Sequence, residues 1–200
     1  MSAPGSKLPV RNCVFAVSLP QVFLSRYDLL ESLVVSTSDD YLSVVRARMV
    51  ADGCVISDEV LGSRSVLLGY KAQVRALSRV HIFIAVVEAG RVDDIGVRNF
   101  VQDVVGLAAN RKGRWRGAQS GIIVIPVMVA GVVNANAIAT VCRPYRLNVG
   151  GFALLAQPVV VDMSEATMWT FRGRRIWGYA FNSLIREKIS AYLPEPVRGE

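Results

Sequence analysis

Apolar residues recur in blocks along the chain, some with the period of a β-strand and others with the period of an α-helix. RVHIFIAVVEA at 79–89 alternates so that both of its faces are apolar, which predicts a central strand covered on both sides. CVISDEV at 54–60 and SRSVLLGYKAQVRA at 63–76 precede it and are rich in strand-forming residues. We therefore expect three consecutive strands here, and a further short strand from CVFAVSL at 13–19.

The segment 93–113 has the clearest helical period in the chain. From Val97, apolar residues follow at offsets of 3, 4, 7, 8 and 11, which is one face of an amphipathic helix. Asp93 or Asp94 supplies its N-terminal cap, because a short acidic side chain can accept hydrogen bonds from the first free amides. A second helix is predicted upstream, with Asp39 or Asp40 as its cap and Gly53 as its end.

Two further segments are predicted to be helical. In 179–193 one side carries mostly apolar residues together with Lys188, and Pro194 ends the helix. In 25–35 the apolar residues again have helical spacing. Two elements are predicted just before the helix at 179–193. GFALLAQPVVVDM at 151–163 is predicted as one buried strand with an edge or bulge at Pro158. A short strand and turn are predicted within 166–178.

An uncharged run extends from Gly117 to Cys142 and is long enough to raise the question of a membrane span. Its apolar residues are β-branched rather than leucine, and Pro126 interrupts it early. Asn134 is well placed to cap a short helix that ends before Pro144. We therefore expect a buried strand followed by a helix, and no membrane span.

Strands interleaved with helices predict a single α/β domain over residues 1–200, with three layers and a mixed central sheet flanked by helices. The ends near 1–9 and 194–200 are polar and proline-rich, and are predicted to be loose tails. Two hundred residues, 52% of them hydrophobic, are sufficient for a substantial core.

Charge is distributed unevenly along the chain, whose net charge is +7. The first hundred residues carry 11 basic and 10 acidic side chains, whereas the second hundred carry 12 and 6. A basic half favours a polyanionic partner, either nucleic acid or an anionic surface. The alternative is that the charge only keeps a very apolar chain in solution.

Cysteine and histidine are too few and too dispersed for a zinc site. The chain has Cys13, Cys54 and Cys142, no C-x-x-C pair and one histidine, His81. Free thiols would indicate a reducing cytoplasm. The sequence also lacks a phosphate-binding loop, a dinucleotide-binding glycine motif and a nucleophile elbow, so no cofactor or metal is expected.

Three clusters combine arginine with aromatic residues and are the positive evidence for a nucleic-acid partner. Arginine can clamp phosphates, and a neighbouring aromatic ring can stack on an unpaired base. The alternative is that these are solvated loops at the ends of strands and helices. The candidate nucleic-acid-binding residues are Arg111, Lys112, Arg114, Trp115 and Arg116 in the first cluster, Arg143 and Arg146 around Tyr145 in the second, and Arg172, Arg174 and Arg175 between Phe171 and Trp177 in the third.

The order of predicted elements and the passage 79–104 resemble the restriction-endonuclease-like superfamily, and in particular relatives of type IV restriction enzymes. That resemblance implies a strand ending in a carboxylate-x-lysine signature, at which Glu88 matches the acidic position and Gly90 stands where the lysine would be. It also implies a magnesium ion held between carboxylates. Asp58 and Lys71 are the candidates for migrated active-site residues.

The sequence therefore predicts a non-catalytic nucleic-acid-binding or regulatory module on a nuclease-like scaffold, located in the cytoplasm, with DNA or RNA as its partner. Two alternatives stay open. One is a structural or interaction protein that forms a homo-oligomer and so buries surplus apolar surface. The other is a metal-dependent nuclease in which Glu88, Lys71 and Asp58 converge.

Overall fold

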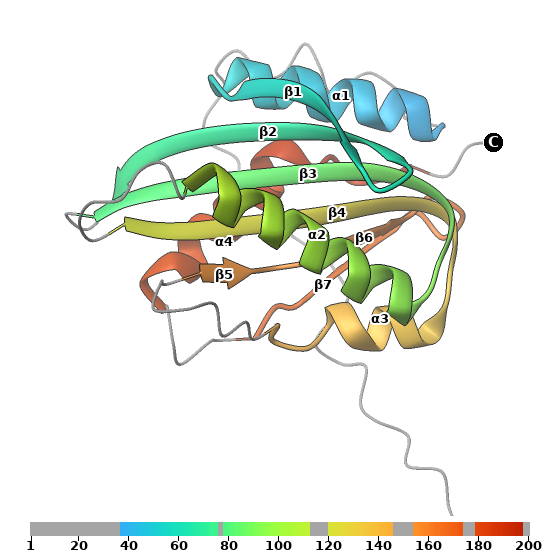
Figure 1. Ribbon diagram of the computed structural model, residues 1–200. Coiled ribbons are helices and arrows are strands. Elements are labelled where there is room, and N and C mark those ends of the chain that lie inside the picture. Colours follow the sequence, from blue (N-terminus) through green and yellow to red (C-terminus); the bar gives the residue numbers. More distant parts are fainter. Residues whose placement is uncertain (1–36, 76–77, 113–119, 146–153, 174–178, 198–200) are drawn as a thin grey trace, which may run out of the picture.

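The computed structural model describes residues 37–75, 78–112, 120–145, 154–173 and 179–197 (Figure 1). The helices of this part are α1 (Ser38–Ala51), α2 (Asp94–Lys112), α3 (Ala135–Val141) and α4 (Tyr179–Tyr192). Its strands are β1 (Val55–Leu61), β2 (Arg64–Arg75), β3 (Ser78–Val92), β4 (Ser120–Val133), β5 (Leu154–Ala156), β6 (Val159–Asp162) and β7 (Thr167–Thr170).

The seven strands form one mixed, open sheet in the order β1-β2-β3-β4-β6-β7, and β5 pairs with β4 beside β6. β1, β2 and β3 are antiparallel neighbours joined in sequence. α2 then returns the chain to the end of the sheet where β3 begins, so that β4 runs parallel to β3. β5 and β6 are also parallel to β4, whereas β7 returns antiparallel to β6.

Helices cover both faces of the sheet, as Figure 1 shows. α1 and α4 pack on one face, where Ile82 and Ile84 of β3 meet Tyr41 and Leu184 in one buried cluster. α2 and α3 pack on the other face around Phe83 and its neighbours. Helices thus cover both apolar faces of β3. The predicted three-layer arrangement of helices around a mixed sheet is confirmed.

α2 confirms its predicted apolar stripe, because Val97 and the five apolar residues that follow it at helical spacing are all buried. Its cap is Asp93, whose Oδ1 accepts a hydrogen bond from the Gly96 amide at 2.7 Å. For α1 the predicted cap is wrong. Thr37 is the capping residue and accepts from the Asp40 amide at 3.2 Å, so the helix begins before both aspartates.

From Ser120 onward the uncharged run forms β4 and α3, as predicted. Every residue from Gly121 to Ala130 is buried in the sheet, and the Asn134 side chain caps α3 by accepting from the Asn136 amide at 3.1 Å. In the described part of the chain no helix is long and apolar enough to cross a membrane.

The predicted single strand at 151–163 is instead two strands, β5 and β6, which pair with successive parts of β4. Gln157 and Pro158 lie between them, and the Gln157 amide donates to Val124 O at 2.9 Å. Proline lacks the donor that a continuous ladder would need. Pro158 therefore separates two strands in the interior of the sheet and does not mark a sheet edge.

The C-terminal residues that the structure describes are partly packed. Pro194 and Pro196 are buried, and the Tyr41 hydroxyl donates to Pro194 O at 3.0 Å. The predicted strand at 13–19, the predicted helix at 25–35 and the tail at 1–9 lie outside the described residues.

Candidate functional site

Two of the three candidate catalytic residues line one open pocket of about 650 Å³ between the first half of α1 and the sheet. Asp58 of β1 and Glu88 at the far end of β3 contribute carboxylates to it, and Asp39 and Arg64 are also in its lining. Asp58 is already paired, because Arg46 Nη2 lies 2.5 Å from its Oδ1. The pocket therefore holds acidic and basic side chains together.

Lys71, the third candidate, does not join this pocket. It pairs across β2 and β3 with Ile82, and Glu88 lies six residues farther along β3, which is about 20 Å in an extended strand. Its ammonium is bound by Asp52, at 2.9 Å from Oδ1 and 2.5 Å from the backbone oxygen. Among the described residues no group of three His, Cys, Asp or Glu side chains is arranged to hold a metal ion.

Asp52 is the centre of a separate polar cluster that is not among the sites predicted from the sequence. It follows α1 as the helix's C-terminal cap, and its Oδ2 accepts hydrogen bonds from Lys188 Nζ at 2.6 Å and from the Tyr192 hydroxyl. The Cys54 thiol donates to the Tyr192 oxygen at 3.5 Å. We call Asp52, Lys71, Lys188, Tyr192 and Cys54 the Asp52 cluster.

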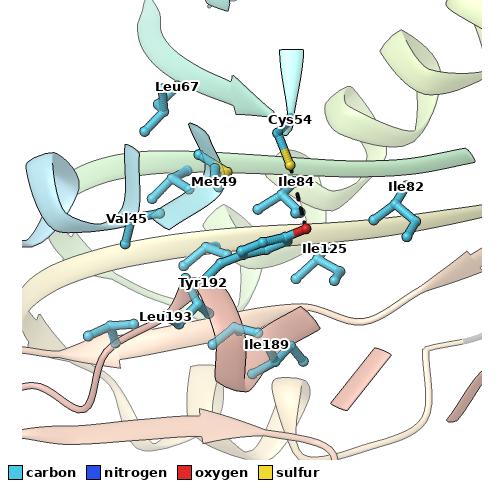
Figure 2. Packing of buried hydrophobic residues seen from close by; sticks show 14 of the residues in the cluster. Val45, Met49, Cys54, Leu67, Ile82, Ile84, Ile125, Ile189, Tyr192 and Leu193 are labelled. Atoms are coloured by element: carbon cyan, nitrogen blue, oxygen red, sulfur yellow. Dashed lines mark hydrogen bonds between the residues drawn. The ribbon is translucent and has the colours of Figure 1, made fainter. Parts of the chain in front are cut away.

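The Asp52 cluster is embedded at the border of the hydrophobic core. Figure 2 shows the Cys54–Tyr192 hydrogen bond among side chains such as Met49, Ile125 and Ile189. The Lys188 side chain is 6% exposed, whereas those of Lys71 and Asp52 are 23% and 25% exposed. The cluster is therefore closed at Lys188 and open to solvent beside Lys71.

Electrostatics in the Asp52 cluster follow from this partial burial. Burial raises the pKa of Asp52, but the hydrogen bonds from Lys188, Tyr192 and Lys71 outweigh it and bring the pKa down from 3.8 to about 2. Burial, together with the nearby Asp52 carboxylate, raises the pKa of Tyr192. Burial also raises the pKa of the Cys54 thiol, so the cluster consists of a carboxylate, neutral hydroxyl and thiol groups, and two lysines.

Only part of the predicted nucleic-acid surface lies within the described residues. Arg111, at the end of α2, forms an ion pair with Glu59 of β1. Arg143 is exposed just after α3, and Arg172 is half-buried after β7, where burial lowers its pKa. Lys112 is the last residue of α2. Arg114, Trp115, Arg116, Arg146, Arg174 and Arg175 lie outside the described residues.

Most of the net charge belongs to the parts of the sequence outside the described residues. The described ranges contain 14 basic and 13 acidic residues, so they carry only +1 of the total +7. The three internal segments 113–119, 146–153 and 174–178 contain five arginines and no acidic residue. The described body of the domain is thus nearly neutral.

These three basic segments adjoin the same end of the sheet. The first leads into Ser120 at the start of β4, and the second leads into Leu154, whose partner in β4 is Ile122. The one arginine of the second segment, Arg146, is at its other end and directly follows Tyr145. The third follows Phe171, whose backbone oxygen accepts a hydrogen bond from Gln157 Nε2 at 2.7 Å, and the Gln157 backbone amide donates to Val124 O in the first half of β4. We call this end, marked by Ser120, Leu154 and Gly173, the strand-start edge.

The cysteines do not all behave as predicted. Cys54 is a free, buried thiol, but Cys142 is disulfide-bonded. The expectation of free thiols throughout is therefore wrong, and cysteine usage does not support a reducing compartment.

Comparisons with protein-family models, with curated proteins and with solved structures found no match for this chain. The observations that bear on function are therefore the pocket, the Asp52 cluster and the strand-start edge.

The Asp52 cluster has one signal in the sequence, which is Lys188. It occupies the apolar side of a predicted amphipathic helix, among residues that are buried. A buried ammonium needs a hydrogen-bonded counter-charge, so a partner carboxylate could have been expected. Its identity could not, because Asp52 is 136 positions away in the chain.

Proposed function

We propose that the protein is a non-catalytic nucleic-acid-binding or regulatory module on a nuclease-like scaffold. The observation that carries the proposal is that three basic segments, which together contain five arginines, border one strand-start edge although they are far apart in the sequence. Neighbouring strands lie about 4.8 Å apart, so arginines from these segments can act on one stretch of phosphate backbone. The near neutrality of the rest of the described domain makes that edge the natural site for a polyanion.

The element order supports the nuclease-like part of the proposal. The resemblance to restriction-endonuclease-like proteins rests on an order of elements that this chain has: a helix, three antiparallel strands, a crossover helix and a parallel strand. The non-catalytic part is supported by the separation of Lys71 from the pocket that contains Asp58 and Glu88.

Binding is tested with paired arginine variants and fluorescence anisotropy of a labelled oligonucleotide. Arg114→Ala with Arg116→Ala, and separately Arg174→Ala with Arg175→Ala, should each weaken binding about tenfold at moderate salt, because each removes two phosphate contacts. The matched control is Arg91→Ala with Arg98→Ala, which removes the same charge near the opposite end of β3. Equal losses in all three double variants would show that only net charge matters and would contradict a site at the strand-start edge.

A homo-oligomer remains the second candidate, favoured by the exposed side of β1. Val55 and Val60 are 67% and 74% exposed, and β1 has one neighbour, β2, among the described strands. Asp58 and Glu59 in the same strand oppose edge-to-edge pairing, as charged residues do on many edge strands. Light scattering tests this second candidate, which requires a stable oligomer, and a monomer would contradict it.

A further inference from the structure

The two lysines of the Asp52 cluster have more hydrogen-bond donors than the cluster has acceptors. Each ammonium carries three donors. Among the described residues, Lys188 Nζ has Asp52 Oδ2 as its hydrogen-bond acceptor, while Lys71 Nζ uses the Oδ1 and backbone oxygen of Asp52. Lys188 Nζ also lies 5.3 Å from the centre of the Tyr192 ring. Two donors on Lys188 and one on Lys71 are therefore available to a further acceptor.

The local charge indicates what kind of acceptor fits. Two ammonium groups share the single Asp52 carboxylate, and Tyr192 donates its hydrogen to that same carboxylate. The next acid is Glu187, whose Oε1 lies 4.0 Å from Lys188 Nζ and whose side chain is 54% exposed. Solvent screens an exposed carboxylate strongly, so the inner part of the cluster keeps an excess of positive charge.

The position of the cluster gives an anion access and places it near the proposed nucleic-acid site. Lys71 and Asp52 are each about one quarter exposed, which opens the cluster on that side. Lys71 lies in the same cross-strand row as Ile82, Ile123 and Leu155. Leu155 is next to the first residue of β5, so this row crosses the sheet close to the strand-start edge, about 14 Å away over three strand spacings.

We propose that Lys71 and Lys188 bind one phosphate group, which accepts hydrogen bonds from both ammonium groups while Asp52 holds them in place. If the phosphate group is a phosphodiester of a bound nucleic acid, this inference rests on the proposed nucleic-acid function. If it is free inorganic phosphate, the inference does not depend on that function. The rival explanation is structural: the lysines only cap the C-terminus of α1 and neutralise Asp52, with water on the spare donors.

The first arm of the test uses inorganic phosphate and the intact chain. Thermal unfolding is followed against phosphate concentration, with chloride at the same ionic strength and pH as reference, because a ligand that binds only the folded state raises Tm. We expect Lys71→Gln to weaken apparent phosphate affinity about tenfold, through loss of a charge-assisted hydrogen bond. Glu187→Gln should change it less than about twofold, because solvent already screens that exposed carboxylate.

The control variant is Arg98→Gln, which removes one exposed cation on the opposite face of the sheet and should leave the phosphate effect unchanged. Circular dichroism checks that each variant is folded, and both Lys71 and Glu187 are exposed enough to be replaced without burying an unpaired charge. If phosphate acts on the wild type no more than chloride does, or if Lys71→Gln and Arg98→Gln respond alike, the phosphate site is overturned and the cluster is structural.

The second arm separates the two sources of phosphate. If the group is a phosphodiester, Lys71→Gln lowers the slope of log affinity against log salt for an oligonucleotide by about one. If the slope is unchanged while phosphate stabilisation is lost, the ligand is free phosphate. Should the wild type bind no oligonucleotide, the proposed function fails, and the phosphate titration still decides the site by itself.

Discussion

Lys188 Nζ in α4 lies 2.6 Å from Asp52 Oδ2 at the end of α1, so two helices from opposite ends of the described chain are joined by an ion pair. Lys71 of β2 binds the other oxygen of the same carboxylate. Asp52 therefore connects three elements on one face of the sheet, and its removal should affect stability more than the loss of either lysine.

We expect Asp52→Ala to lower the free energy of unfolding by about 3 kcal/mol, because it leaves the buried Lys188 without its counter-charge. Lys188→Met should cost less, since Asp52 keeps Lys71 and Tyr192 and the new side chain is apolar. Urea denaturation of both variants and of the double variant measures this. In the double variant the cost of Asp52→Ala should shrink; simple additivity of the two costs would contradict the coupling.

The decrease in the free energy of unfolding at low pH should also depend on Asp52. Its pKa falls from 3.8 to about 2 on folding, so the stabilisation is fully present above pH 3.8 and is lost as the pH falls through 2. The shift corresponds to about 2 kcal/mol. Unfolding measured between pH 6 and pH 2 should show a shallower decline for Asp52→Asn than for the wild type, and identical slopes would show that the carboxylate is not specially stabilised.

Gly69 in β2 allows Met49 of α1 to pack directly against the sheet. A Cβ at this position would lie 2.5 Å from Met49 Sδ, and Met49 is fully buried. Gly69→Ala should therefore destabilise the protein by about 1–3 kcal/mol through overpacking. Gly106→Ala is the control, because that helical position has open space around it and alanine favours a helix. Equal or opposite effects would mean that Met49 moves aside at little cost.

The local parts of the fold could be predicted from the sequence because they depend on nearest neighbours. The stripe in α2, the double-sided burial of β3 and the Asn134 cap are short-range patterns, and all three were predicted correctly. The cap of α1 and the role of Pro158 were not. Several polar residues precede α1, so several caps fit, and a proline between two strands that share one neighbour looks the same in sequence as a proline at an edge.

The candidate sites could be predicted less well, because they depend on which distant residues meet. Asp58 and Glu88 both line the pocket, but nothing in the sequence shows that Lys71 is held by Asp52. The positions of the described residues that flank the basic segments are likewise a consequence of topology. They follow from the parallel pairing of β4, β5 and β6, which sequence patterns do not specify.

The arrangement of Glu88, Asp58 and Lys71 predicts no metal-dependent cleavage of DNA. Hydrolysis needs an activated water and charge stabilisation at the phosphate, and the lysine candidate is bound to Asp52, away from the two pocket carboxylates. Supercoiled and single-stranded DNA should stay intact with excess protein and magnesium or manganese. Cleavage that disappears in Glu88→Ala would reveal a working active site in the pocket, whereas cleavage that persists in that variant would arise elsewhere.

If arginines at the strand-start edge bind a phosphate backbone, as we propose, the affinity of the wild type for nucleic acid must fall as salt rises, and this salt dependence is the most direct test. Anisotropy titrations with mixed-sequence DNA and RNA at several salt concentrations give log affinity against log salt. Five arginines that each neutralise one phosphate predict a slope of about −4.5 on duplex DNA and about −3.5 on a single strand, with little dependence on sequence. A slope near zero, or no binding of either nucleic acid at low salt, would contradict the claim.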